Sequence, residues 1–109
     1  MEHNIEEAVR LYKLAAEQND PAAQNNLGVC YEKGKGVEQD YAEAVRLYKL
    51  AAEQNDPVAQ SNLGVCYEDG LGVEQNIEEA IRLYKLAAEQ GDEGSIARLE
   101  ELKKNQDEN

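Results

Sequence analysis

The sequence is poor in the side chains on which most enzymes and metal sites depend. Its 109 residues include one histidine, two cysteines and two prolines, with no tryptophan and no phenylalanine. The histidine is His3, next to the N-terminus, so the serines and cysteines lack a plausible histidine partner for nucleophilic catalysis. No cluster of His, Cys, Asp and Glu has the spacing of a metal site. We therefore expect no catalytic residue, no metal and no cofactor.

Basic residues and long apolar runs are also lacking. Eleven lysines and arginines stand against 23 aspartates and glutamates, which gives a net charge of −12. Because phosphate binding requires a basic face, neither nucleic acid nor an anionic membrane is expected as a partner. No apolar run approaches the roughly 18 residues that span a bilayer, and Met1-Glu2-His3 begins no signal peptide. We expect a soluble chain, whose acidity either maintains solubility or favours a basic peptide partner.

A repeat of 36 residues dominates what is present. Residues 4–39 and 40–75 differ at seven aligned positions and are identical at the other 29. A third copy starts at Asn76 and diverges after Gly91. A fixed period of this length, built from two helical segments, is typical of a stacked helical solenoid. We predict an all-α, right-handed α-solenoid of about six helices, forming a single repeat domain over residues 1–109 with units 2–37, 38–73 and 74–109.

Each unit begins with a helix whose start is marked by polar caps. In the second unit, Asp40 is suited to cap the helix, and Glu43 is suited to bond the N–H of the cap residue, as in a capping box. Apolar residues then recur at helical spacing on one face, at Ala44, Leu47, Tyr48, Ala51 and Ala52. This first helix is predicted to end at Gln54-Asn55, because asparagine can adopt the left-handed conformation of a helix stop.

The second helix of the unit is predicted to begin at Asp56-Pro57, with aspartate as the cap and proline at the first helical position. Gly64 and its counterpart Gly28 each weaken a helix interior by up to about 1 kcal/mol relative to alanine. Their recurrence indicates that a neighbouring helix approaches closely. Gly70-Leu71-Gly72-Val73 then predicts a tight reversal, and not a phosphate-binding loop, because no strand precedes it.

Cys30 and Cys66 occupy equivalent positions in consecutive copies. Equivalent helices in a stack lie at least about 8–10 Å apart, whereas a disulfide requires Cα atoms within about 7 Å. We therefore predict two reduced thiols that pack as small apolar groups. Reduced thiols fit a reducing compartment and so favour the cytoplasm.

These motifs resemble the Sel1-like repeat, a relative of the tetratricopeptide repeat. The resemblance rests on Gln60-Ser61-Asn62-Leu63-Gly64-Val65-Cys66-Tyr67 with Gly70-Leu71-Gly72-Val73, and on Ala80-Ile81-Arg82-Leu83-Tyr84 with Ala87-Ala88-Glu89-Gln90-Gly91. The sequence departs from the family at Leu47, where tryptophan is usual, and at Ala16 and Ala23, where cysteine-rich members carry a bridging pair. The resemblance implies a non-catalytic adaptor scaffold whose concave surface binds a protein or peptide.

By analogy with tetratricopeptide repeats, the second helix of each unit lines that concave groove. The groove positions implied by the resemblance are Ala22, Asn25, Val29, Glu32 and Lys33 in one copy, and Val58, Ser61, Val65, Glu68 and Asp69 in the next. Three of the seven differences between the copies fall in this set (22/58, 25/61 and 33/69), although the set holds only five of the 36 positions. A groove adapted to a partner and free drift at a surface both account for this pattern.

The two ends of the array suggest a second interpretation. The first helix lacks the helix that precedes its counterparts, so we expect Ile5, Val9, Leu11 and Tyr12 to have fewer neighbours and to offer a homodimer interface. The last helix, over residues 95–104, keeps one apolar stripe and is charged elsewhere, as in a solvating C-terminal cap. Near-identical units of whole-number length suggest a consensus design or an excised segment. The alternative function is therefore a structural or designed self-assembling module with no natural groove ligand.

Overall fold

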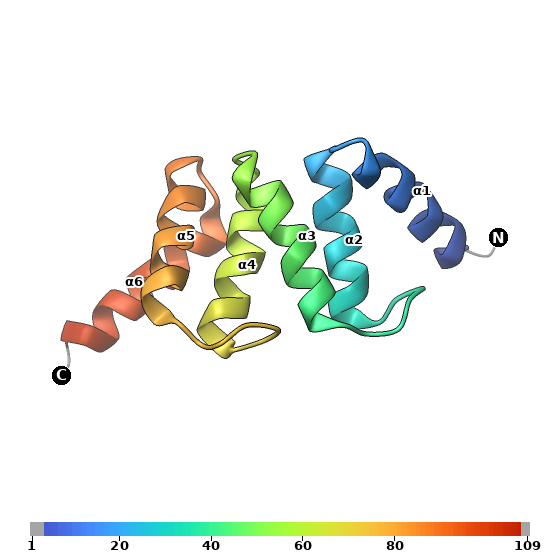
Figure 1. Cartoon of the computed structure of the whole chain (residues 1–109). Coiled ribbons are helices and arrows are strands. Elements are labelled where there is room, and N and C mark those ends of the chain that lie inside the picture. The colour runs from blue at the N-terminus through green and yellow to red at the C-terminus, as the bar shows by residue number, and fades with distance from the viewer. Residues whose placement is uncertain (1–3, 108–109) are drawn as a thin grey trace.

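The computed structural model of the chain describes residues 4–107, and over this range the chain forms six helices and no strand. The first helices of the units are α1 (Ile5–Glu17), α3 (Tyr41–Glu53) and α5 (Ile77–Glu89), and the second helices are α2 (Pro21–Lys33), α4 (Pro57–Asp69) and α6 (Glu93–Asp107). They follow one another along an elongated array from α1 to α6, which measures 50 × 27 × 24 Å (Figure 1). The predicted all-α repeat fold is confirmed.

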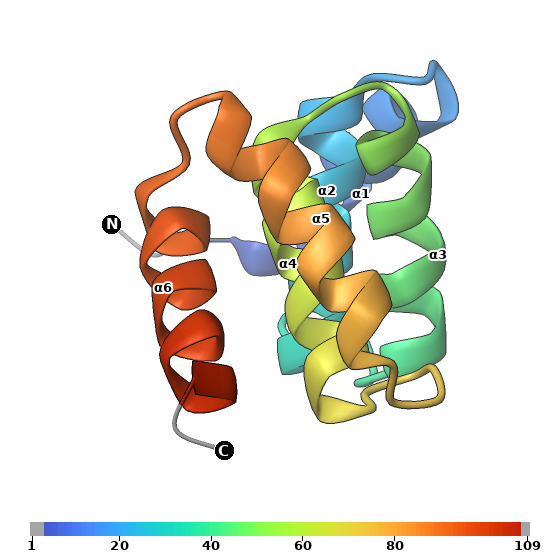
Figure 2. The ribbon, with the colours of Figure 1, turned by 90° about the vertical axis from the view of Figure 1, so that its left-hand side faces the viewer.

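Successive helices pack side by side, and the most extensive contacts join α2 to α3 and α4 to α5. Viewed along the array, α3 lies on one side of the molecule and α6 on the other (Figure 2). None of the helices between residues 4 and 107 combines the length with the apolar character that crossing a bilayer requires.

Of the two hydrogen bonds in the predicted capping box, the first helices form only the one accepted by the side chain of the cap residue. The side chains of Asn4, Asp40 and Asn76 each accept a hydrogen bond from the backbone N–H three residues on, at 3.0–3.1 Å. The reciprocal bond predicted for Glu43 is wrong, because the N–H of Asp40 donates to the carbonyl of Tyr31 at 2.9 Å. With that donor occupied, the Glu43 carboxylate pairs with Arg46 at 2.5 Å.

The turn after each first helix contains a residue in the left-handed backbone conformation, at the position that the sequence predicted. Asn19 and Asn55 each have a φ of 68°, and Gly91 takes the same role after α5 with a φ of 89°. In the reversal after α4, Gly72 has a φ of 73°, and a Cβ there would lie 2.5 Å from the carbonyl oxygen of Tyr41. Glycine is therefore required twice over at this position, for the backbone conformation and for the contact with the start of α3.

The core is built on tyrosines that lie directly on a helix backbone. Tyr48 and Tyr84 are 0% and 1% exposed. A Cβ on Gly28 would lie 2.7 Å from the Tyr48 ring, and a Cβ on Gly64 would lie 2.6 Å from the Tyr84 ring. The predicted close approach at both glycines is confirmed, and it is a tyrosine ring of the following first helix that occupies the space.

Each core tyrosine also has a polar anchor. The hydroxyl of Tyr48 donates to Glu32 at 2.7 Å, and that of Tyr84 donates to Glu68 at 2.7 Å. Burial, together with the neighbouring carboxylate, raises the pKa of both phenols. The phenols therefore remain protonated donors at any ordinary pH.

Both cysteines are free, as predicted. Cys66 is buried in the central cluster with Ala44, Val45 and Tyr48, and burial raises the pKa of its thiol to about 12. Cys30 is only half-buried, at the margin of the cluster formed by Val9, Leu27 and Leu47. The expectation of a buried thiol thus holds for Cys66 and only in part for Cys30.

The N-terminal helix has fewer neighbours on one face, as expected for Leu11 and Tyr12. Leu11 is 51% exposed, whereas its counterpart Leu47 is 2% exposed. The expectation is corrected for Val9, which is buried against Leu27 of α2 and does not lie on the open face. Ile5 is exposed, but its Cγ2 lies against the Gly36 turn, since a Cβ on Gly36 would approach it to 2.7 Å.

The contact between glycine and tyrosine generates a stability prediction. Gly64→Ala should destabilise the chain by about 2 kcal/mol, because the added methyl group overlaps the Tyr84 ring and this outweighs the better helix propensity of alanine. Gly94→Ala in α6 is the matched control, since a Cβ there meets only Asp92 at 3.8 Å. Its effect should lie between zero and a gain of about 1 kcal/mol. Urea unfolding of both variants measures this, and equal stability of Gly64→Ala and wild type would refute it.

Candidate functional site

Four of the five groove positions predicted on α4 line one hollow. This cavity, of about 380 Å³, is lined by Ser61, Val65, Glu68, Asp69, Tyr84, Gly94 and Arg98. Glu68 and Asp69 end α4, whereas Gly94 and Arg98 come from α6, and the buried Tyr84 of α5 forms part of the floor. The structure therefore brings the second-unit positions together and adds an arginine that the sequence reasoning did not place there.

Two exposed valines extend the hollow along α4. Val58 and Val65 are 50% and 39% exposed. They are seven residues apart, which places them on the same side of the helix two turns from each other, with Ser61 between them. We call Val58, Ser61 and Val65 the α4 stripe. It places apolar surface directly before the two carboxylates at the end of the helix.

Glu68 is the electrostatic centre of the hollow. The Arg98 guanidinium forms an ion pair with its carboxylate, with Nε 3.0 Å from Oε1, and also binds Glu101 at 2.7 Å. The hydrogen bond from Arg98 lowers the pKa of Glu68; partial burial opposes this effect, and the bond from Tyr84 adds to it. Two carboxylates, Glu68 and Asp69, thus line the hollow with one guanidinium, so its formal charge is negative.

The corresponding positions on α2 are not equivalent to those on α4. Asn25 is buried and accepts a hydrogen bond from Asn62 of α4 at 2.9 Å, which removes it from the accessible surface. Val29 is half-buried against the central cluster, and Glu32 is half-buried beneath the Tyr48 hydroxyl. Ala22 and Lys33 remain exposed. One cause of the difference is that Asn62 of α4 bonds to Asn25 of α2, whereas Arg98, the counterpart of Asn62 in α6, bonds to Glu68.

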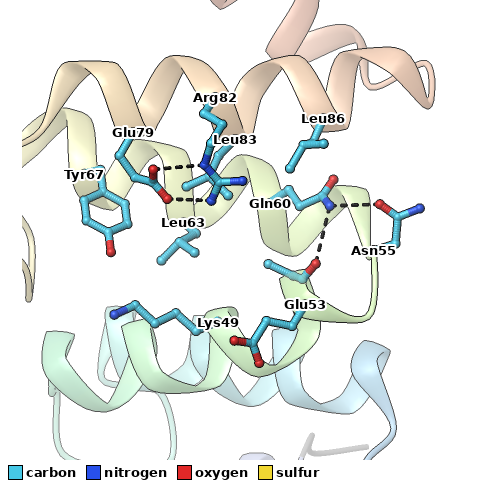
Figure 3. A pocket seen from close by; sticks show the side chains of 11 residues that line it. Lys49, Glu53, Asn55, Gln60, Leu63, Tyr67, Glu79, Arg82, Leu83 and Leu86 are labelled. Atoms are coloured by element: carbon cyan, nitrogen blue, oxygen red, sulfur yellow. Dashed lines mark hydrogen bonds and ion pairs between the residues drawn. The ribbon is translucent and has the colours of Figure 1, made fainter.

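Two larger cavities lie between consecutive first helices, where the sequence reasoning placed no site. One, of about 530 Å³, lies between α3 and α5 against α4 (Figure 3), and the other, of about 440 Å³, lies between α1 and α3 against α2. Every residue that lines one is matched 36 positions away in the other by the same amino acid. The first cavity is lined by Lys49, Ala52, Glu53, Asn55, Gln60, Leu63, Tyr67, Glu79, Arg82, Leu83 and Leu86.

The polar groups in these cavities are largely bonded to each other. Figure 3 shows the Glu79–Arg82 ion pair on one wall, at 2.6 Å, and Gln60 bonded to Asn55, at 3.0 Å. The buried Gln60 also accepts a hydrogen bond from Gln90 at 3.0 Å. These glutamines and asparagines tie each turn to the next, and this structural role explains why the residues repeat.

No group of three or more His, Cys, Asp and Glu side chains within residues 4–107 is arranged to hold a metal ion. The one fully buried thiol, Cys66, has a raised pKa and is therefore a poor nucleophile. What the hollow offers is a set of contacts for a ligand: an apolar stripe, a hydroxyl and two carboxylates.

A comparison with protein families finds the Sel1 repeat at residues 1–20, 21–56 and 57–92. Each complete match contains a second helix followed by a first helix, α2 with α3 and α4 with α5, which are the pairs with the most extensive contacts. The predicted units 2–37, 38–73 and 74–109 have the same length of 36 residues, but each starts before a first helix, whereas the complete family matches start at a second helix. A search of curated proteins found no match.

Solved structures of Sel1-type proteins resemble the chain closely. The protective antigen c5321 of uropathogenic Escherichia coli is 44% identical over 84% of this chain, with a TM-score of 0.82. A Sel1 repeat protein from Oxalobacter formigenes is 42% identical over 91%, with a TM-score of 0.85. Cysteine-rich protein B of Helicobacter pylori is 29% identical over 89%, with a TM-score of 0.83. The chain spans 20%, 41% and 73% of the lengths of these three proteins.

The ion pair at Glu68 predicts a pH-dependent contribution to stability. Glu68→Gln should destabilise the chain by about 1–2 kcal/mol at pH 7, because the Arg98 guanidinium loses its carboxylate. The pKa of Glu68 is lowered in the folded state, so its contribution is present above the unfolded value of about 4.3 and disappears as the pH falls through the folded value. Urea unfolding at pH 7 and at pH 3 should show a larger difference from wild type at pH 7 than at pH 3.

Glu32→Gln is the matched control for this prediction. Glu32 accepts the equivalent tyrosine bond, and among the described residues it makes no ion pair with an arginine. Glutamine can still accept from Tyr48, so the variant should cost less than Glu68→Gln at pH 7. An equal cost for the two variants would contradict the role assigned to Arg98.

Proposed function

The chain belongs to the Sel1 repeat family, and we propose that it is a non-catalytic adaptor that binds a protein or peptide along α4. Proteins of this family are generally scaffolds for protein interactions and typically not enzymes. The observation that carries the proposal is the α4 stripe, where exposed valines lead into the hollow at Glu68 and Asp69. Apolar surface of this kind beside fixed charges is what a peptide with mixed side chains requires.

The charges at the site favour a basic segment as the ligand. A lysine or arginine of the ligand would approach the exposed Asp69, because Glu68 is already paired with Arg98, while apolar side chains cover Val58 and Val65. The net charge of −12 accelerates encounter with such a segment and slows encounter with an acidic one. Lys33, the counterpart of Asp69, places a cation at the same position one repeat away. We therefore expect the groove to favour a basic ligand residue near Asp69 and an acidic one near Lys33.

Substitution of the α4 stripe tests the adaptor proposal. Peptides selected from a displayed random library on the wild-type chain should combine apolar side chains with lysine or arginine. The double variant Val58→Ser, Val65→Ser should bind the selected peptide roughly tenfold more weakly, because the ligand then covers hydroxyl groups in place of methyl groups. Fluorescence anisotropy gives both dissociation constants.

Ile77→Ser is the matched control for this experiment, since Ile77 is as exposed as Val65 but begins α5 outside the hollow. This variant should bind the peptide as wild type does. Undiminished binding by the double valine variant would refute the groove proposal, and so would an equal loss in the Ile77 variant.

A second candidate is a structural or self-assembling module that has no groove ligand and forms a homodimer through α1. The exposure of Leu11 supports it. Light scattering over a wide range of concentration separates the candidates: a dimer that dissociates on dilution, and that Leu11→Asp abolishes, favours assembly. A constant monomer would refute the homodimer.

A further inference from the structure

One contact in the hollow on α4 departs from the repeat. Arg98 of α6 is the counterpart of Asn62 in α4, 36 residues earlier. The side chain of Asn62 donates to Asn25 on the preceding second helix at 2.9 Å. Arg98 instead reaches the last turn of α4, where it forms an ion pair with Glu68. A guanidinium of α6 therefore covers a carboxylate that lines the hollow.

The carboxylate of Glu68 is fully used within the chain. Its Oε1 accepts from the Tyr84 hydroxyl at 2.7 Å and from Nε of Arg98 at 3.0 Å, and its Oε2 accepts from Nη2 of Arg98. The Glu68 side chain is only 12% exposed. Its counterpart Glu32 accepts from Tyr48 and makes no ion pair among the described residues. Arg98 accounts for this difference between the two carboxylates.

Arg98 is held in its position from two sides. Its Nη1 donates to Glu101, one turn further along α6, at 2.7 Å, while Nε and Nη2 face Glu68. Two parallel bonds between a guanidinium and one carboxylate fix the orientation of both groups, which a lysine ammonium does not do. The Arg98 side chain is 37% exposed and lines the hollow together with Val65. It therefore occupies space that a ligand would otherwise enter.

We propose that Arg98 is the specificity-determining residue of this hollow, because it fills from within the chain the place where an arginine of a ligand would pair with Glu68. This inference rests on the proposed adaptor function. With Arg98 in place, the exposed Asp69 is the carboxylate of the hollow that is left for the ligand. The preferred ligand therefore carries one basic side chain at this point, and removal of Arg98 changes the preference to two.

Two effects exclude a second ligand cation from the wild-type hollow. A guanidinium or ammonium of the ligand would meet the Arg98 guanidinium at the same carboxylate, and like charges repel. It would also have to replace the bonds that Arg98 already makes to Glu68. Discrimination between ligands often depends on such a repulsive group. The net charge of −12 attracts basic segments in general, so Arg98 supplies a selection among them that overall charge lacks.

Methylguanidinium tests the place beside Glu68 without any peptide. In Arg98→Ala, millimolar methylguanidinium chloride should give saturable shifts of the amide NMR signals of Glu68 and Gly94. It should also raise the melting temperature above that in an equal concentration of sodium chloride, because a cation again pairs with the carboxylate. Wild type should show neither change, since its own guanidinium holds the place.

Arg82→Ala is the matched control for this titration. Arg82 pairs with Glu79 on the wall of the cavity between α3 and α5, and the Glu79 side chain is 28% exposed, against 12% for Glu68. Methylguanidinium should give no saturable shift there, because an ion pair with a more exposed carboxylate contributes little. A saturable response of wild type, or no response of Arg98→Ala, would overturn the proposal.

Parallel peptide selections test the consequence for the ligand. A displayed random library is selected separately on wild type and on Arg98→Ala. The first peptides should carry one lysine or arginine beside their apolar side chains, and the second should carry two. In fluorescence anisotropy the second peptides should bind Arg98→Ala at least about tenfold more tightly than wild type. The double variant Arg98→Ala, Glu68→Gln should lose this gain, because the carboxylate used by the second cation is absent.

Arg98→Gln controls for a loss of fold in the alanine variant. Glutamine keeps part of the aliphatic stem and can still donate to Glu68, so its helical circular dichroism should match wild type. Because the positive charge is removed, peptides with two basic residues should bind it more tightly than wild type. The same peptide preference in wild type and both variants would contradict the role of Arg98, and so would a gain that survives Glu68→Gln.

Failure of the adaptor function gives a different result. Peptides would then bind the double variant Val58→Ser, Val65→Ser as they bind wild type, while methylguanidinium would still bind Arg98→Ala. That outcome would overturn the specificity assigned to Arg98 together with the groove. Weaker binding by the valine variant, combined with an unchanged peptide preference in Arg98→Ala, would overturn only the role of Arg98 and leave the adaptor function in place.

Discussion

The rest of the structure depends on a tyrosine ring seated on the backbone of the preceding helix at a glycine. The ring replaces the side chain that the glycine lacks, and the phenol hydroxyl reaches a glutamate one turn further along the same helix. This contact fixes the distance, the rotation and the axial register between two helices at once, since the ring has one place to lie and the hydroxyl one acceptor. Repeating it every 36 residues produces the array.

The same constraint separates the residues that build the array from those that are available for binding. Most positions in the interfaces between helices, including the glutamine and asparagine pairs at the turns, are identical in the two complete copies; position 25/61 is an exception, since the buried Asn25 has Ser61 as its counterpart. Positions 22/58 and 33/69 face outward and differ. A change at the first kind alters how helices stack, and a change at the second alters only what the surface presents to a ligand. A scaffold of this design can acquire new partners without loss of its fold.

Charge is distributed unevenly over the two ends of the array. At the C-terminal end, Arg98 pairs with one carboxylate of the hollow, and α6 has Glu100 and Lys104 where α4 has Gly64 and Glu68. At the N-terminal end, Leu11 of α1 is 51% exposed and Tyr12 is half-buried, whereas their counterparts in α3 are buried. The two ends are therefore chemically unlike, and the array has a direction.

The sequence by itself determined the helix pairs, the cap residues Asn4, Asp40 and Asn76, the turns and the close approach at Gly28 and Gly64, because these follow from local propensity and from a period visible along one chain. It did not determine which of the predicted groove positions are accessible. Asn25 and Val29 occupy the same place in the repeat as Ser61 and Val65. Asn25 is buried and bonded to Asn62 of α4, and Val29 is half-buried against the central cluster, whereas Ser61 and Val65 line a hollow beside α6. That outcome depends on contacts between residues about 30–37 positions apart, such as Arg98 with Glu68, which only the tertiary structure brings together.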